Sequence, residues 1–148
     1  VGSEMCIRDR PDTVKPNIGS YDAIRVYLWA GMLADDDEHK AALLKQLQPM
    51  AQLTAQQGVP PEKTDTASGK THGDGPVGFS ASMLPMLAHE SEALQVQRQR
   101  IKQNPPGDRA YFSASLALFG QGWDQQRYRF NRQGELQTSW GGQCVTSE

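Results

Sequence analysis

The chain has 148 residues, of which 37% are apolar and 22% are charged, and its formal net charge is −2. This length allows one domain with its own core, and the composition is that of a globular rather than a disordered protein. The charge is near zero and the Lys and Arg residues are scattered, so we expect no nucleic-acid partner. No apolar run approaches the roughly 20 residues of a membrane-spanning helix, so we expect no membrane insertion.

The first ten residues, VGSEMCIRDR, are not expected to belong to the fold. They resemble translated sequencing-adaptor sequence, and they lack the apolar centre of a signal peptide. Without Cys6, the remaining cysteine is Cys144, and one thiol can form neither an internal disulfide nor a multi-cysteine zinc site. We therefore expect the native sequence to start at about Pro11 and to continue a chain that begins upstream.

Residues 21–33 are predicted to form a buried helix, because they are apolar on nearly every side. Ser20 is the expected N-cap. Asp22 lies in the predicted first turn, where a carboxylate meets the positive end of the helix dipole, and Arg25 follows on the same face. Two interpretations of this pair stay open. It is either an ordinary helix-end ion pair or a catalytic base at the mouth of a cleft, held ionised by the guanidinium.

Residues 38–57 are predicted to form an amphipathic helix with one face in water. Pro49 is expected to bend this helix and Gly58 to end it. Residues 59–78 are rich in Gly and Pro and are predicted to form a long connection. Connections of this length are uncommon in compact domains and tend to be functional or mobile.

Two apparent motifs in this connection are rejected. The letters SGKT resemble the end of a phosphate-binding loop, but that motif requires a glycine where Thr64 stands and an apolar strand before it. His72 and Asp74 have no third ligand at a recognised spacing. We therefore expect a polar surface loop, and we predict neither a metal nor a cofactor.

The second half of the chain continues an alternation of apolar and polar helices. Residues 80–88 are mostly uncharged, Ser91–Gln103 is polar, and an apolar helix containing Tyr111 is expected to follow a cap at Asp108. Two concentric rings of helices would produce this alternation, with the inner helices covered all round. In the tail, apolar and polar residues alternate around residues 131–134, which predicts a small hairpin.

Four aromatic residues near predicted helix ends could form flat platforms for sugar rings: Tyr111, Phe112, Trp123 and Tyr128. Most aromatic residues at helical spacing are packed in the core instead. Tyr111 is the best candidate platform, because it opens an inner helix.

Three stretches of the sequence resemble glycoside hydrolase family 8: IGSYDAIRVYLWAGML, PPEKTDTASGKTHGDGPVGFSASMLPML, and LFGQGWDQQRYRF with a closing GELQTSWG. The resemblance covers essentially everything from Pro11 to the end. It implies an all-α fold, the C-terminal part of an (α/α)6 barrel with a small terminal β-hairpin. It also implies that residues 11–148 belong to a single glycoside hydrolase catalytic domain.

The resemblance further implies an inverting endo-β-1,4-glucanase, that is, a cellulase. In the family the aspartate of the Y-D-A-x-R element is the general base, which corresponds to Asp22, and Tyr21 and Arg25 would position it. Tyr111 and Trp123 are candidate substrate-binding residues. The proton-donating glutamate of the family lies in a region that this chain does not contain, so we expect the chain alone to be inactive.

Partners and location are likewise implied only by the resemblance. It implies a β-1,4-glucan as substrate, the bacterial cellulose synthase complex as partner, and a periplasmic or secreted location. An incomplete ring of helices should leave inner faces open to water, and we expect this at Trp29 and Phe79.

Two kinds of alternative remain. Within the family, the substrate could be xylan or chitosan, which the Y-D-A-x-R element cannot separate from cellulose. Chitosan would call for acidic groups in the cleft, and Glu62, Asp65 and Asp74 are too few to indicate it. Outside enzymes, the chain could be a non-catalytic helical module that binds a glycan or a protein.

Overall fold

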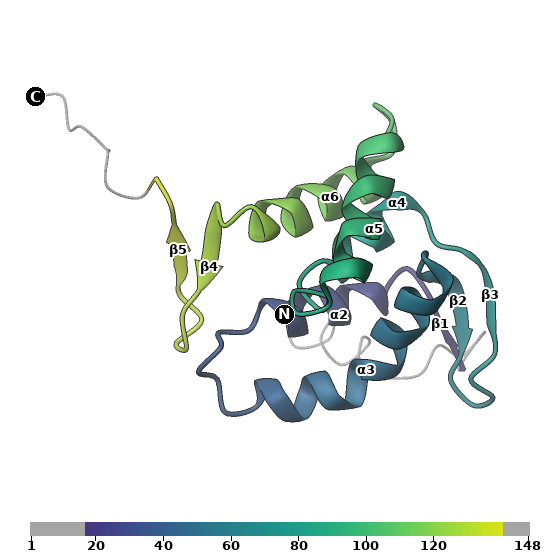
Figure 1. Ribbon diagram of the computed structural model, residues 1–148, viewed down its shortest axis with the longest axis horizontal. Helices are drawn as coiled ribbons and strands as arrows, with labels where there is room; N and C mark the ends of the chain where they lie inside the picture. The colour runs from purple at the N-terminus through teal and green to yellow at the C-terminus, as the bar shows by residue number, and fades with distance from the viewer. Residues whose placement is uncertain (1–16, 141–148) are drawn as a thin grey trace, which may run out of the picture.

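The computed structural model describes residues 17–140 (Figure 1). The predictions for residues 1–10 and Cys144 lie outside this range. The helices of the described part are α2 (Ile24–Met32), α3 (Lys40–Gln57), α4 (Val77–Met83), α5 (Ser91–Gln103) and α6 (Tyr111–Asp124). Its strands are short: β1 (Ile18–Gly19), β2 (Pro61–Asp65), β3 (Thr71–Asp74), β4 (Tyr128–Phe130) and β5 (Leu136–Thr138).

The helices form two layers, as the alternating pattern predicted. Helix α4 is buried along almost its whole length and packs against α2 on one side and α6 on the other. Helices α3 and α5 cover this inner layer, α3 against α2 and α5 against α4. Burial therefore explains both sequence patterns. The outer helices are buried on one side and are amphipathic, whereas the inner helices are buried on nearly all sides and are apolar.

The three inner helices run in the same direction. Near their N-terminal ends, the Tyr21 ring, just before α2, contacts Phe79 in α4 and Phe112 in α6. At the other end, the Tyr128 hydroxyl, just after α6, lies 3.8 Å from the Met32 sulfur that ends α2. Inner helices that share one direction bring their N-terminal ends to one end of the molecule.

The predicted exposure of the inner helices is confirmed at one residue and wrong at the other. Trp29 is 45% exposed and packs edge-on against Phe119, with ring centroids 5.6 Å apart. Phe79 is only 1% exposed. The difference arises because Phe79 lies in the first turn of α4, beneath Tyr21, whereas the ring that Trp29 packs against is itself partly open to water.

Residues 59–78 do not form the irregular connection that was predicted. Strands β2 and β3 form a hairpin, and β1 adds to it antiparallel, so the sheet order is β1-β2-β3. The Asp65 carboxylate shapes the turn by accepting the backbone N–H of Ala67 at 2.9 Å and of Ser68 at 3.0 Å. The strands carry polar residues such as Lys63 and His72, which hid them from a search for apolar runs.

The predicted helix caps fail at two of three places. Ser20 does not cap α2, because its hydroxyl bonds to the hairpin and the helix begins at Ile24 after a turn. Asp108 does not cap α6, whose N-cap is Ala110 without a side-chain bond. Gly58 does end α3, with a φ of +72° that suits glycine and its N–H bonded to Thr54 at 2.9 Å.

The predicted C-terminal hairpin is confirmed. Strands β4 and β5 pair antiparallel, with Phe130 opposite Leu136. The turn closes through the Gly134 N–H, which donates to the Asn131 carbonyl at 2.9 Å. Figure 1 shows this hairpin and the β1-β2-β3 sheet at opposite ends of the molecule, with α2 between them.

Candidate active site

Aromatic rings gather where the N-terminal ends of the inner helices meet. The centroid of the Tyr21 ring lies 5.2 Å from that of Phe79 and 5.4 Å from that of Phe112, in tilted or edge-on contacts. Such geometries are favourable for aromatic pairs and fix the rings relative to one another. Tyr21, the residue immediately before Asp22, is therefore held in place by contacts with the first turns of α4 and α6.

Asp22 lies at the surface of this end. Its side chain is 96% exposed, and its Oδ1 accepts a hydrogen bond from Nη2 of Arg25, one turn along the chain. An exposed ion pair of this kind contributes little to stability. It does hold one carboxylate oxygen, while no described residue bonds to Oδ2. The carboxylate is thus oriented and open to a molecule arriving from solvent.

Tyr111 occupies the same end, because it precedes Phe112 in the first turn of α6. It is 84% exposed, the largest exposure among the big apolar and aromatic side chains of the described residues. A ring presented in this way can meet the face of a sugar through apolar contact. Its role as a sugar platform stays a prediction.

Trp123 does not occupy this end, so the structure does not bring it together with Tyr111. It follows Tyr111 by 12 positions on α6, so the two lie about 18 Å apart along the helix axis. Trp123 is only 8% exposed, and the Arg129 guanidinium covers its ring at 3.9 Å from the centroid. The sequence could not separate an exposed from a buried aromatic residue on one apolar helix.

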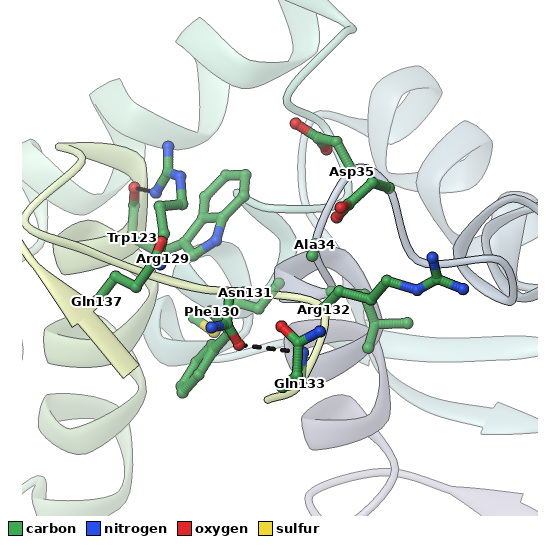
Figure 2. A pocket seen from close by; sticks show the side chains of 12 residues that line it. Ala34, Asp35, Trp123, Arg129, Phe130, Asn131, Arg132, Gln133 and Gln137 are labelled. Atoms are coloured by element: carbon green, nitrogen blue, oxygen red, sulfur yellow. Dashed lines mark hydrogen bonds between the residues drawn. The ribbon is translucent and has the colours of Figure 1, made fainter. Parts of the chain in front are cut away.

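A pocket of about 600 Å³ lies at the opposite, C-terminal end of α2 and α6 (Figure 2). Met32, Asp35, Trp123 and Arg129 are among its lining residues. A hydrogen bond from Lys40 at 2.7 Å lowers the pKa of the Asp35 carboxyl, and burial lowers the pKa of Arg129. This pocket shares no lining residue with the Asp22 end, so the two regions are separate.

In residues 17–140, no three His, Cys, Asp or Glu side chains lie close enough together to hold a metal ion. His72 and Asp74 are on strand β3 rather than in a loop, and they line a second surface pocket of about 460 Å³. Over the same residues, no helix combines the length and the apolar character that crossing a membrane requires.

Comparison with known proteins places this arrangement in a family. Residues 8–126 match the Glycosyl hydrolases family 8. The chain belongs to this family. The sequence resemblance is thereby confirmed, and the family-8 chain is part of an (α/α)6 barrel, with α2, α4 and α6 as inner helices and α3 and α5 as outer ones.

Several relatives of this family-8 chain are named Endoglucanase. Those of Escherichia coli K12 and Salmonella typhi are 55% and 56% identical to it over 133 residues, which is 90% of this chain and 36% of each relative. The crystal structure of an endo-1,4-D-glucanase from Vibrio fischeri ES114 matches 89% of this chain and 39% of its own, with a TM-score of 0.72 and 36% identity. The chain spans little more than a third of the length of these relatives.

Sequence reasoning on the family-8 chain missed the residues that support the Asp22 end from outside α2. Ser20 donates its hydroxyl to the Glu62 carbonyl at 2.6 Å, and the Tyr21 hydroxyl lies 3.5 Å from Oε1 of Glu62. These partners are more than 40 positions apart in the chain. Only the strand character of Pro61–Asp65 could have indicated them, and its polar composition concealed it.

Proposed function

We propose that the full-length protein carrying this chain is an inverting endo-β-1,4-glucanase in which Asp22 is the general base. Membership of family 8 and relatives named Endoglucanase at 55% identity support the activity. The observation that carries the role of Asp22 is its carboxylate, oriented by Arg25 and open to solvent at the end where Tyr21 and Tyr111 present aromatic rings.

In an inverting hydrolysis, one carboxylic acid protonates the glycosidic oxygen while a carboxylate removes a proton from water on the opposite face of the sugar. The two carboxyl groups are then about 6.5–9.5 Å apart, which leaves room for that water. Asp22 would use Oδ2 to take the proton, because Arg25 holds Oδ1. The acid is expected from a part of the domain outside this chain.

Tyr21 and Arg25 would act on Asp22 rather than on the glucan. The Tyr21 ring is held between Phe79 and Phe112, so it fixes the backbone immediately before the base. Arg25 fixes the rotation of the carboxylate itself. Tyr111, with its exposed ring, would hold a glucosyl unit near this position.

Substrate, partner and location are proposed on the resemblance of the three sequence stretches. We propose a β-1,4-glucan chain as substrate, the cellulose synthase complex as partner, and a periplasmic or secreted location. An export signal in the upstream reading frame and co-purification with the synthase would support these proposals. A full-length protein without such a signal, found only in the cytoplasm, would contradict the location.

The role of Asp22 is tested by Asp22→Asn in the full-length protein. General base catalysis typically contributes 10²–10⁴-fold, so turnover of carboxymethylcellulose should fall by about that factor while glycan binding is largely retained. Asp36→Asn is the matched control, because Asp36 is an exposed carboxylate beside the pocket at the other end of α2. Unchanged turnover in Asp22→Asn would remove the proposed base, and a full-length wild-type protein that binds glycan without turnover would favour the non-catalytic binding module.

A further inference from the structure

The segment that leads into Asp22 is held by the β2-β3 hairpin rather than by helix α2. Strand β1 pairs with β2 so that Gly19 lies opposite Thr64. Beyond the strand, the backbone N–H of Thr66 donates to the Asn17 carbonyl at 2.7 Å. The chain therefore enters the Tyr21–Asp22 turn from a fixed strand and not from a free loop.

Glu62 on strand β2 contacts both residues that precede Asp22. Its backbone carbonyl accepts the Ser20 hydroxyl at 2.6 Å, and its carboxylate Oε1 lies 3.5 Å from the Tyr21 hydroxyl. The other carboxylate oxygen lies against Gly73, where a Cβ would come within 3.0 Å of it. Gly73 has a φ of +69°, so both its conformation and the space that it leaves suit glycine.

The hairpin is in turn fixed to the outer layer. Nη2 of Arg100 on α5 donates to the Gly75 carbonyl at 2.7 Å, just after β3, and Nη1 donates to the Ser80 hydroxyl at 2.6 Å. Gln97, one turn earlier on α5, donates to the Gly58 carbonyl at 3.0 Å, just before β2. Both ends of the hairpin are thus tied to one helix, which makes it a rigid support.

The Tyr21 ring and hydroxyl have different constraints. The ring is wedged between two other rings, so its plane is set by packing. The hydroxyl is at the edge of the site, and Glu62 is the described residue that accepts from it. A distance of 3.5 Å is long for such a bond, but contacts of this kind often tighten only when substrate binds.

We propose that the Glu62 side chain is a positioning residue for the base: through the Tyr21 hydroxyl it sets the direction in which Asp22 faces its water, while the Glu62 backbone carbonyl holds Ser20. This inference rests on the proposed function of Asp22. The physical basis is that a displacement of about 1 Å at reacting atoms can cost about 10²-fold in rate, whereas one exposed hydrogen bond contributes little to folding. Loss of the Glu62 carboxylate should therefore reduce turnover much more than stability.

The test uses Glu62→Ala and Glu62→Gln in the full-length protein, with Lys63→Ala as the matched control. Lys63 is the next residue of the strand, and its ammonium lies 3.8 Å from the same carboxylate oxygen. We expect Glu62→Ala to lower kcat about tenfold, with KM changed less than twofold. Glu62→Gln keeps an acceptor oxygen and should recover to within about threefold of wild type, and Lys63→Ala should match wild type.

A double-mutant cycle with Tyr21→Phe separates positioning from a general effect. If Glu62 acts through the Tyr21 hydroxyl, Glu62→Ala should lower kcat further by less than twofold once that hydroxyl is absent. Full additivity would overturn the proposal, and so would a Glu62→Ala enzyme as active as the Lys63→Ala control. If Glu62→Ala lowers the melting temperature of the protein, Glu62→Met is used in its place. Methionine keeps the length of the side chain without its carboxylate, and the same kcat criteria apply.

The outcomes for Glu62 and for Asp22 can be told apart. If the wild type is active, Asp22→Asn is inactive and Glu62→Ala is fully active, the proposed role of Glu62 is wrong and the proposed role of Asp22 stands. Equal turnover in wild type and Asp22→Asn would remove the proposed base, and the role of Glu62 with it.

Discussion

The contact between α4 and α6 predicts that Gly120→Ala should be strongly destabilising. A Cβ at position 120 would lie 2.1 Å from the Ala81 carbonyl oxygen, about 1.3 Å closer than ordinary van der Waals contact allows. Both partners are helix backbone, so no flexible side chain can move aside. Helix α4 is buried between α2, α5 and α6, and it cannot retreat without disturbing them.

The expected magnitude follows from overpacking in a dense core. Inserted methyl or methylene groups in well-packed sites cost about 1–3 kcal/mol, and a backbone clash of this depth belongs at or above the upper end. Phe79 and Ser82 move with α4, so the Tyr21 ring that rests on Phe79 should also shift. We therefore expect loss of stability together with reduced turnover.

The assay is thermal and urea unfolding of the full-length protein, with Gly107→Ala as the matched control. A Cβ at Gly107 would have no atom within 4 Å, and the residue has no positive φ, so the added methyl group meets nothing there. Gly107→Ala should be neutral or slightly stabilising, because it restricts the unfolded chain. Equal melting temperatures for the two variants would refute the proposed α4–α6 contact.

Three further outcomes are expected. Tyr111→Ala should raise KM for soluble β-1,4-glucan about five- to tenfold with a smaller effect on kcat, since one aromatic contact contributes about 1 kcal/mol, and initial-rate kinetics would check this. Asp35, whose pKa the Lys40 hydrogen bond lowers below 3.8, should stabilise the fold above about pH 4 and lose that effect as pH falls further. Urea unfolding of Asp35→Asn should therefore differ from wild type by at most about 1 kcal/mol at pH 6, and the difference should shrink as pH falls below about 4. The 148-residue chain alone should show no hydrolysis of carboxymethylcellulose, and hydrolysis by the pure chain would contradict the proposal that the general acid lies outside it. The chain alone should also bind a hydrophobic dye, because Trp29 and Phe119 are exposed.

The sequence predicts the helices of this chain well because their signal is local. The buried positions Ile24, Leu28 and Met32 recur every four residues on α2, and the outer helix α5 shows the complementary polar pattern. The assignment of each helix to the inner or the outer layer follows from that periodicity. Helix starts are less predictable, because Ser20 has a hydroxyl that can either cap a helix or bond to a distant strand.

The polar hairpin could not be predicted by the same reasoning. The inward-facing residues of strands usually alternate with polar ones, but Pro61–Asp65 reads as Pro-Glu-Lys-Thr-Asp, with only its first residue buried. Its strand form depends on pairing with β1 and β3 and on the contacts of α5 with its two ends. Information of this kind lies in tertiary contacts, which composition and spacing do not record.

The same distinction explains which site residues the sequence could predict. Asp22 and Arg25 are three positions apart, so local chain geometry brings them together and the sequence alone predicts their pairing. Glu62 is linked to Tyr21 only because the hairpin folds back beside the start of α2. Trp123 shares its helix with Tyr111 but faces the covering Arg129 at the other end. The proposed base and its ion pair can therefore be found from immediate neighbours in the sequence, whereas the Glu62 contact can be found only from the fold.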